Sequence, residues 1–210
     1  FNSYNSGEIV GIDNSHNTPG SIGGLVGFVS SAKTSQVSIE NCYNTSNIDA
    51  ENLPMVGGLA GKIQSSGSSS GITFKNCYNS GSVSGKEQVG GIAGLITAPD
   101  ASNTSKITIN NCYSAASSVD YSKYFEDDGP VTAGTGVGEV SVYTDASKFS
   151  LSNVFVRNFQ ELPAIGADSS NIDLSAITPL SVAQMAEEGF ATVLGGAFAN
   201  FSQDLYLKDD

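Results

Sequence analysis

Three cysteines are the residues of this chain whose type and spacing most directly suggest chemistry. Cys42, Cys77 and Cys112 lie at intervals of 35 residues, and each stands between an Asn and a Tyr. Thiols at a regular spacing could bind a metal, form a disulfide between neighbouring units or fill a small packing site. Two related phrases carry Ser3 and Val154 in the same slot, and an odd number of cysteines cannot all pair. We therefore expect buried packing side chains, with a disulfide or a metal ligand as the alternatives.

The irregular segment 120–130 combines aromatic and acidic side chains. Its aromatic residues are candidates for ligand binding, because exposed aromatics on a long loop can contact a partner. These candidates are Tyr121, Tyr124 and Phe125. Its acids are candidate ligands for weak calcium binding through carboxylate oxygens. They are Glu126, Asp127 and Asp128. The alternatives are that the aromatics anchor the loop on the rest of the chain and that the acids form a solvated loop.

Catalytic motifs are not evident. The single histidine, His16, lies in a polar segment, and one histidine cannot supply a His-Glu-x-x-His zinc site. The Gly-rich phrases lie inside strand-like repeats, which does not match a phosphate-binding loop before a helix. Arg157 is the only arginine, and acids do not recur at one repeat position, which argues against a polysaccharide lyase or hydrolase. We expect no catalytic residues and no cofactor.

Two repeated phrases define the elements that must position these residues. The first phrase begins at Asn2, Asn41, Asn76, Asn111 and, in a more divergent form, Asn153. The second phrase, Gly-Gly followed by Leu or Ile, a small residue and Gly, occupies 23–27, 57–61 and 90–94. Repeats of this length are typical of stacked units that bury their apolar faces against one another. We predict an all-β repeat protein, a right-handed, parallel β-helix-like solenoid of about four coils of roughly 35 residues each. A sandwich or meander of the same strands is the structural alternative.

The residues before each Cys predict a strand with one unusual feature. Segments 37–40, 72–75 and 107–110 alternate β-branched or aromatic residues with polar ones. Strict alternation would place Phe74 inside and Cys77 outside, whereas Val154 in the Cys slot indicates that this slot faces inward. We therefore predict that the alternation changes phase at the Asn through a bulge or corner, because Asn tolerates left-handed backbone angles. Stacked Asn side chains are then expected to form a hydrogen-bonded ladder.

An aromatic column is expected beside the cysteines. Its members are Tyr4, Tyr43, Tyr78, Tyr113 and Phe155, and they should stack about 4.8 Å apart. The column either stabilises the sheet through contacts between strands or, if exposed, presents flat faces to sugar rings.

The chain divides by pattern into repeats over 1–157 and a C-terminal cap over 158–210 that packs on them rather than folding independently. In the cap, Ser181 is a possible N-cap of a short helix, with Val182, Met185 and Ala186 on one face. A cap is expected because open ends of stacked sheets expose strand edges and core.

Composition limits the choice of partners. The 210 residues carry a net charge of -12, and only 14% are charged, so nucleic acid and anionic membranes are poor partners. No apolar run approaches the roughly 20 residues that span a bilayer, so we expect no membrane insertion in this segment. Phe1 begins in the middle of a repeat, which is typical of a piece trimmed from a longer precursor.

The paired phrases resemble the GLUG-motif repeats of bacterial cell-surface proteins. The match lies at 24–27, 58–61 and 91–94, each followed by an Asn-Cys-Tyr-Asn-type phrase, and covers roughly residues 1–155. The unit that contains Gly134-Thr135-Gly136-Val137-Gly138 departs from the pattern. The resemblance implies secretion, display on a bacterial cell surface and a role in cell adhesion of the Bacteroides type, and it supplies no catalytic residues.

We accordingly expect a non-catalytic secreted or cell-surface module. It would bind a host protein or glycan, or act as a structural spacer in a larger surface protein. The alternative is a fragment of a β-helical enzyme that degrades polysaccharides.

Overall fold

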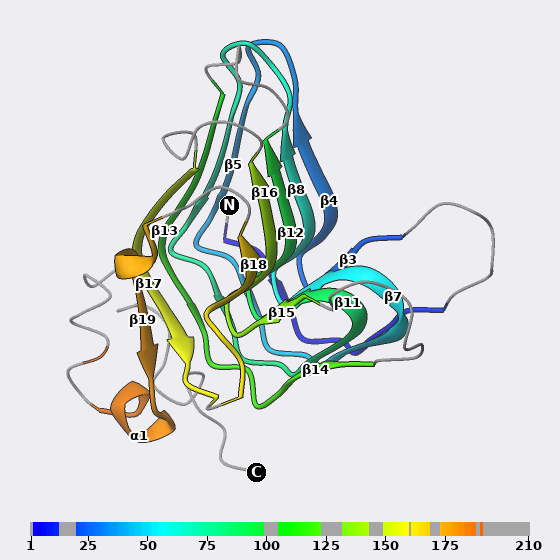
Figure 1. Ribbon diagram of the computed structural model, residues 1–210, viewed down its shortest axis with the longest axis vertical. Coiled ribbons are helices and arrows are strands. Elements are labelled where there is room, and N and C mark those ends of the chain that lie inside the picture. The colour runs from blue at the N-terminus through cyan, green and yellow to red at the C-terminus, as the bar shows by residue number, and fades with distance from the viewer. Residues whose placement is uncertain are drawn as a thin grey trace.

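The structure is a computed structural model that describes residues 2–12, 20–98, 105–122, 132–142, 149–159, 161–168, 173–187 and 190. The described chain is mostly β, and its strands form three sheets (Figure 1). All the pairings between the described strands are parallel. The prediction of an all-β chain is therefore confirmed, and the parallel pairing of all described strands excludes an antiparallel meander for these residues.

Each repeat contributes to all three sheets in turn. Sheet A contains β1 (Tyr4–Asn5), β6 (Tyr43–Asn44), β10 (Tyr78–Asn79), β13 (Lys106–Ser114), β17 (Phe149–Arg157) and β19 (Ile177–Leu180), together with β5 (Gln36–Glu40) and β9 (Gly71–Lys75). Sheet B contains β2 (Ile9–Val10), β3 (Ile22–Gly23), β7 (Ile48–Gly57), β11 (Val83–Gly90), β14 (Val119–Tyr121) and β15 (Ala133–Gly134). Sheet C contains β4 (Val26–Ser31), β8 (Ala60–Ser65), β12 (Ala93–Ala98), β16 (Val137–Val142) and β18 (Ile165–Asp168).

The register places equivalent residues of successive repeats beside one another. Tyr4 pairs with Tyr43, Tyr43 with Tyr78, Tyr78 with Tyr113, and Tyr113 with Phe155. The same register holds in sheet C, where Val29 pairs with Ile63 and Ile63 with Ile96. Sheets A and C face each other, and sheet B curls beside them (Figure 1). One repeat in the sequence therefore corresponds to a step of one strand in each sheet.

Apolar side chains gather in three places. The largest cluster fills the space between sheets A and C and includes Ile63, Ile72, Phe74 and Cys77. A second cluster lies inside the curl of sheet B, around Ile48, Val56, Val83 and Val89. The third lies on the other side of sheet A, where Tyr78, Tyr113 and Phe155 meet Met185 and Phe190. The C-terminal segment therefore covers part of the outer face of sheet A.

The Asn that opens each first phrase forms the predicted corner. The φ angles are positive at Asn2, Asn41, Asn76, Asn111 and Asn153, between 49° and 56°. Phe74 and Cys77 consequently face the same core, although they are three residues apart. The Asn76 amide Nδ2 donates to Asn41 Oδ1 at 2.9 Å, and Asn111 Nδ2 donates to Asn76 Oδ1 at 2.8 Å. Both the phase change and the Asn ladder are confirmed, because Asn is among the few residues that adopt left-handed angles at low cost.

A second Asn ladder runs through the last residue of the same phrase. Asn44 and Asn79 are fully buried in strands β6 and β10. Asn5 Nδ2 donates to Asn44 Oδ1 at 2.9 Å, and Asn44 Nδ2 donates to Asn79 Oδ1 at 2.8 Å. Asn79 Nδ2 also donates to the carbonyl oxygen of Gly81 at 2.8 Å. These bonds satisfy amides that burial would otherwise penalise.

Replacing Asn79 with Ala is expected to lower the free energy of unfolding by about 2 kcal/mol. The substitution removes an acceptor from Asn44 Nδ2 and a donor from the Gly81 carbonyl, and buried groups left without partners cost about 1–3 kcal/mol each. Chemical denaturation of both proteins measures the difference. Asn52→Ala is the matched control because Asn52 is exposed, and we expect it to change stability by less than about 0.5 kcal/mol. Equal losses in the two variants would contradict a structural role for the buried ladder.

The C-terminal segment continues two of the sheets. Strand β18 pairs with β16 in sheet C, and β19 pairs with β17 in sheet A. A 3-10 turn, η2 (Leu174–Ala176), precedes β19, and the Asp173 carboxylate accepts a hydrogen bond from Ser175 N at its start. This hydrogen bonding with Ser175 holds the pKa of the Asp173 carboxyl below its ordinary value. The division between 157 and 158 stays a prediction.

The helix α1 (Val182–Met185) begins at Ser181, as predicted. The Ser181 hydroxyl accepts from Gln184 N at 3.2 Å, and Gln184 Oε1 accepts from Ser181 N at 2.9 Å, which is a capping box. Met185 is buried and Val182 is half-buried, but Ala186 is exposed. The helix thus presents Met185 to the aromatic cluster on sheet A.

Candidate functional site

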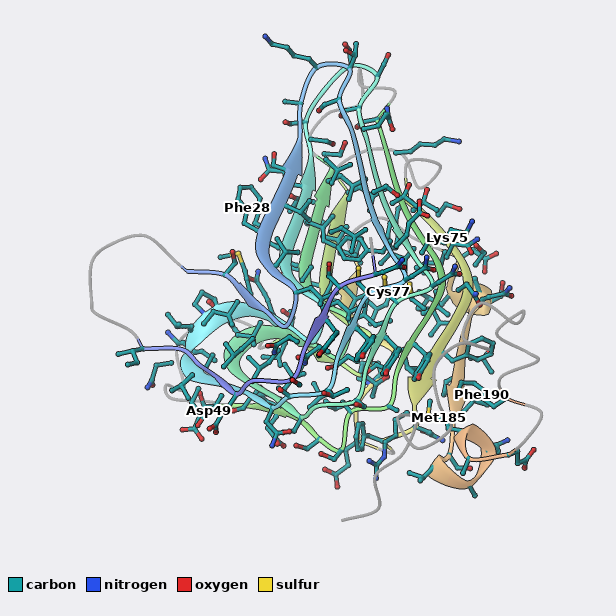
Figure 2. The ribbon with its side chains drawn as sticks, turned by 180° about the vertical axis from the view of Figure 1, so that it is seen from behind. Phe28, Asp49, Lys75, Cys77, Met185 and Phe190 are labelled. Atoms are coloured by element: carbon teal, nitrogen blue, oxygen red, sulfur yellow. The ribbon has the colours of Figure 1, made fainter. Side chains whose placement is uncertain are left out.

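The cysteine column lies inside the core between sheets A and C. Cys77 and Cys112 are fully buried and Cys42 is 4% exposed. All three thiols are free, and Cys112 pairs in register with Val154 (Cys77 is labelled in Figure 2). Each Sγ donates to the carbonyl two residues before it, to Glu40 O, Lys75 O and Asn110 O. The packing interpretation of the three cysteines is confirmed.

Two of these thiols are held in the protonated form. The hydrogen bond with Cys77, together with burial, raises the pKa of the Cys42 thiol above its ordinary value. The hydrogen bond with Cys112, together with burial, raises the pKa of Cys77, although its hydrogen bond with Cys42 acts in the opposite direction. Because the thiolate is the nucleophile and the metal ligand, both groups are poorly reactive at neutral pH.

Metal binding finds no support in the part of the chain that the structure describes. There, no three His, Cys, Asp or Glu side chains come together in an arrangement that could hold a metal ion. The predicted calcium ligands Glu126, Asp127 and Asp128 lie outside the described residues, as does His16. Their roles stay predictions.

The aromatic column forms as predicted, and its exposure changes along its length. The ring centroids of Tyr4 and Tyr43 are 5.1 Å apart, and those of Tyr43–Tyr78 and Tyr78–Tyr113 are 4.9 Å apart, with nearly parallel rings. Tyr4 is 64% exposed, whereas Tyr78 and Tyr113 are buried. At its C-terminal end, the column is therefore buried and mainly stabilises the packing of the sheet.

Phe190 packs the C-terminal segment against the aromatic column. Its ring meets Tyr113 edge-on at 5.6 Å and Phe155 edge-on at 5.5 Å. Figure 2 shows Phe190 and Met185 on the same side of the molecule. Such edge-to-face contacts are favourable aromatic geometries. Sugar rings therefore cannot reach the faces of Tyr113 in this conformation.

The first repeat leaves apolar side chains exposed. Val10 is 60% exposed, Ile12 is 72% exposed and Phe28 is 51% exposed. Phe28 points outward from β4 (Figure 2), and the Lys62 ammonium lies 5.5 Å from the centre of its ring. This contact is a cation–π interaction between neighbouring strands of sheet C. The N-terminal edges of the sheets are thus the most apolar part of the described surface.

Tyr121 is the one predicted ligand-binding residue that the structure describes, and it ends β14, an edge strand of sheet B. It pairs with Gly85, in a column where the preceding repeat carries Ala50. A Cβ at Gly85 would lie 2.7 Å from Val56 Cγ2, so this slot faces the core inside sheet B. At Tyr121 the side chain remains 43% exposed. Tyr124 and Phe125 lie outside the described residues.

Two carboxylates lie on the outer face of sheet B, on the side of the sheet opposite to the Tyr121 slot. Asp49, Ser84 and Asp120 pair in register across β7, β11 and β14, and both acids are exposed. Two strand spacings of about 4.8 Å separate Asp49 from Asp120. Glu51 is also exposed, and its carbonyl oxygen accepts from the Ser122 hydroxyl at 2.6 Å. Tyr121 follows Asp120 and its slot belongs to the opposite face of the sheet, so the exposed part of its side chain lies at the edge strand β14. We call Asp49, Ser84, Asp120 and Tyr121, which border this edge from its two faces, the sheet B edge patch.

Sequence reasoning found Tyr121 but missed the carboxylate column beside it. The signal was present in the alternation of 48–50, 83–85 and 119–121, where the first residue of each triplet is apolar and inward. Aligning those triplets would have placed Asp49, Ser84 and Asp120 together on the outer face. Because Tyr121 belongs to the opposite face of β14, a polar ligand with a flat apolar face would contact both its ring and the Asp120 carboxylate only at the edge of the strand.

Comparisons of the chain with family models, curated proteins and solved structures gave no match. In the described part of the chain, helices long and apolar enough to cross a bilayer were not found.

Proposed function

We propose that the chain is a β-solenoid that serves as a non-catalytic module of a bacterial surface protein and displays the sheet B edge patch to a glycan. The proposal rests on one observation: the residues that repeat between units are buried, whereas residues that vary between units are exposed. The repeated residues Cys77, Tyr78, Asn79 and Leu59 are fully buried and are used in packing between units. Residues that differ between units, such as Tyr121 and Asp120, are exposed.

A rigid stack of repeats whose exposed positions vary suits ligand recognition better than catalysis. Repeat proteins commonly hold their scaffold constant and vary the surface residues that meet a partner. At the edge of β14 the exposed part of the Tyr121 ring can supply a flat apolar face, and the carboxylates of Asp120 and, further along the outer face, Asp49 can accept hydrogen bonds from sugar hydroxyls. The net charge of -12 disfavours acidic polysaccharides, so we propose neutral glycans as the ligand class.

The resemblance to GLUG-motif repeats agrees with this role, since it implies secretion and surface display. The in-register columns of Cys, Asn and Tyr support the solenoid arrangement, because each unit closes the apolar face of the next. A spacer that holds a separate adhesive domain away from the cell is the role that remains if the patch does not bind.

Glycan-array binding tests the display role. We expect the chain to bind neutral glycans, and Tyr121→Ala to weaken that binding up to about tenfold, because contact with an aromatic ring supplies about 0.5–1.5 kcal/mol. Tyr4→Ala is the matched control, since Tyr4 is exposed on a different sheet and should bind within twofold of the unchanged chain.

Other outcomes separate the alternatives. Binding that Tyr121→Ala leaves unchanged would place recognition elsewhere on the molecule. A chain that binds no glycan would contradict the proposal and leave the binding of a host protein or the spacer role. Release of soluble sugars from neutral polysaccharides, lost in Asp120→Asn, would favour the enzymatic alternative, because two aspartates whose strands lie about 9.6 Å apart can place their carboxyl groups near the separation of roughly 6.5–9.5 Å that inverting glycosidases use.

A further inference from the structure

Neither packing of the core nor display of a surface patch requires a thiol group at the positions of the cysteine column. The register Tyr43–Tyr78 sets Cys42 beside Cys77, and the register Tyr78–Tyr113 sets Cys77 beside Cys112. Val154 and Ser3 fill the same slot in other units, so a thiol is not needed there for packing. Packing alone therefore does not explain why three successive units each carry a thiol.

We propose that the column is an oxidation site at which one disulfide forms between adjacent units, always through Cys77, with Cys42 or Cys112 as its partner. Paired residues of neighbouring strands lie about 4.8 Å apart, within the Cα separation of about 4.4–6.8 Å that disulfides use. Cys42 and Cys112 are two strands apart, about 9.6 Å, which exceeds the limit of about 7 Å. The geometry thus permits two alternative disulfides and excludes the third.

The orientation of the thiols favours the pair Cys42–Cys77. All three Sγ atoms point to the carbonyl two residues earlier, so they form a row with the same side-chain direction. Cys77 Sγ also lies 3.4 Å from the Ile39 carbonyl, which belongs to the unit of Cys42. Turning one side chain toward the other breaks only a weak S–H···O bond. The Cys77 thiol already extends toward the unit in which its proposed partner lies.

Access to an oxidant also favours Cys42. Its 4% exposure is small, but Cys77 and Cys112 have none. On its N-terminal side, Cys42 is covered by the segment that contains Asn2 and Ser3, and both of these residues are exposed. Ser3 N donates to Cys42 Sγ at 3.5 Å. Local opening of this edge strand exposes Cys42 before the other thiols. The raised pKa values of Cys42 and Cys77 make the reaction slow at neutral pH and faster at alkaline pH.

The chemistry requires a two-electron oxidant, for which we name diamide, an azo compound. One thiolate adds to the N=N bond, and the second thiolate attacks the first sulfur. The S–S bond forms, the S–N bond breaks, and the hydrazine product takes up two protons and two electrons. The disulfide would add a covalent bond between two units that the backbone alone otherwise connects. This inference does not depend on what the surface binds.

The experiment treats the folded chain with diamide at alkaline pH and then counts free thiols after denaturation. The unchanged chain should fall from three thiols to one. Cys42→Ser and Cys112→Ser should each fall from two thiols to none, whereas Cys77→Ser should keep both of its thiols. Peptide mapping should find mainly Cys42–Cys77 in the unchanged chain. Non-reducing gels confirm that the products are monomers.

Controls keep the outcome decisive. Serine already occupies the slot at Ser3, and Cys77→Val, whose side chain matches Val154 in the same slot, replaces Cys77→Ser if the serine variant does not fold. Monomeric Cys77 variants that lose both thiols to an intramolecular disulfide would overturn the proposal. It would equally be overturned if the unchanged chain kept all three thiols under conditions that oxidise a small dithiol completely.

Discussion

Replacing Gly58 with Ala is expected to lower the free energy of unfolding by about 3 kcal/mol or more, an effect that chemical denaturation measures. A Cβ at Gly58 would overlap with the carbonyl oxygen of Gly91 in the next repeat and with the side-chain amide of buried Asn79. The backbone would have to move apart, and overpacking of this kind typically costs about 1–3 kcal/mol and occasionally more. Because the contact is with backbone, rotation of a side chain cannot relieve it.

Gly7→Ala provides the matched control for Gly58→Ala. A Cβ at Gly7 would meet only Asn5 Oδ1, at 3.8 Å, which is ordinary van der Waals contact. We expect this variant to lie within about 0.5 kcal/mol of the unchanged chain. The double variant Gly58→Ala/Asn79→Ala separates the two contacts at Gly58. If it recovered the stability of Asn79→Ala alone, the overlap with the Gly91 carbonyl would not be the cause of the loss.

Tyr78→Ala is expected to cost about 3–5 kcal/mol, the range found when large aromatic side chains are removed from cores. Tyr78 is fully buried, and its ring lies between those of Tyr43 and Tyr113 at 4.9 Å on each side. The substitution leaves a cavity in the middle of the aromatic column and removes two stacking contacts. Thermal and chemical unfolding, followed by circular dichroism, measure the loss.

Tyr4→Ala tests whether burial, rather than membership of the column, decides the effect. Tyr4 occupies the same position in its repeat, but 64% of it is exposed, and among the described residues it stacks on Tyr43 alone. Its replacement should cost at most about 1 kcal/mol. If Tyr4→Ala and Tyr78→Ala destabilised the chain equally, the column would contribute through strand propensity and not through core packing.

The two repeated phrases occur together because their residues contact each other. The last Asn of the first phrase packs against the second glycine of the Gly-Gly phrase, as Asn44 does at Gly24 and Asn79 at Gly58. The third pair replaces Asn by Ser114 at Gly91. A side chain at the glycine and an amide at the Asn cannot share this space, so the two residue types are needed together. Sequence reasoning identified both phrases but could not see that they meet.

The candidate site was less accessible to sequence reasoning than the fold. Tyr121 was identified because aromatic residues are conspicuous in an irregular segment, and the structure places it at the exposed end of β14. The neighbouring Asp49 comes from a strand more than sixty residues earlier. Only the pairing of β7, β11 and β14 brings Asp49 into one outward column with Asp120, the residue before Tyr121.

By itself, the sequence determined the local conformation and the spacing of equivalent residues. The Asn corners, the alternation of buried and exposed residues and the Ser181 cap follow from short-range rules of backbone sterics and hydrogen bonding. These rules act within a few residues, which is why the phase change at Asn76 could be predicted from Phe74, Cys77 and Val154. The tertiary structure alone decided which copy of a repeated residue is buried. Tyr4 and Tyr78 share a local sequence, but only Tyr78 lies beneath distant segments of the chain. Strands β18 and β19 likewise join sheets A and C without either phrase. Their places depend on the backbone hydrogen bonds that an open sheet edge offers to any extended segment, and no repeated side chain encodes them.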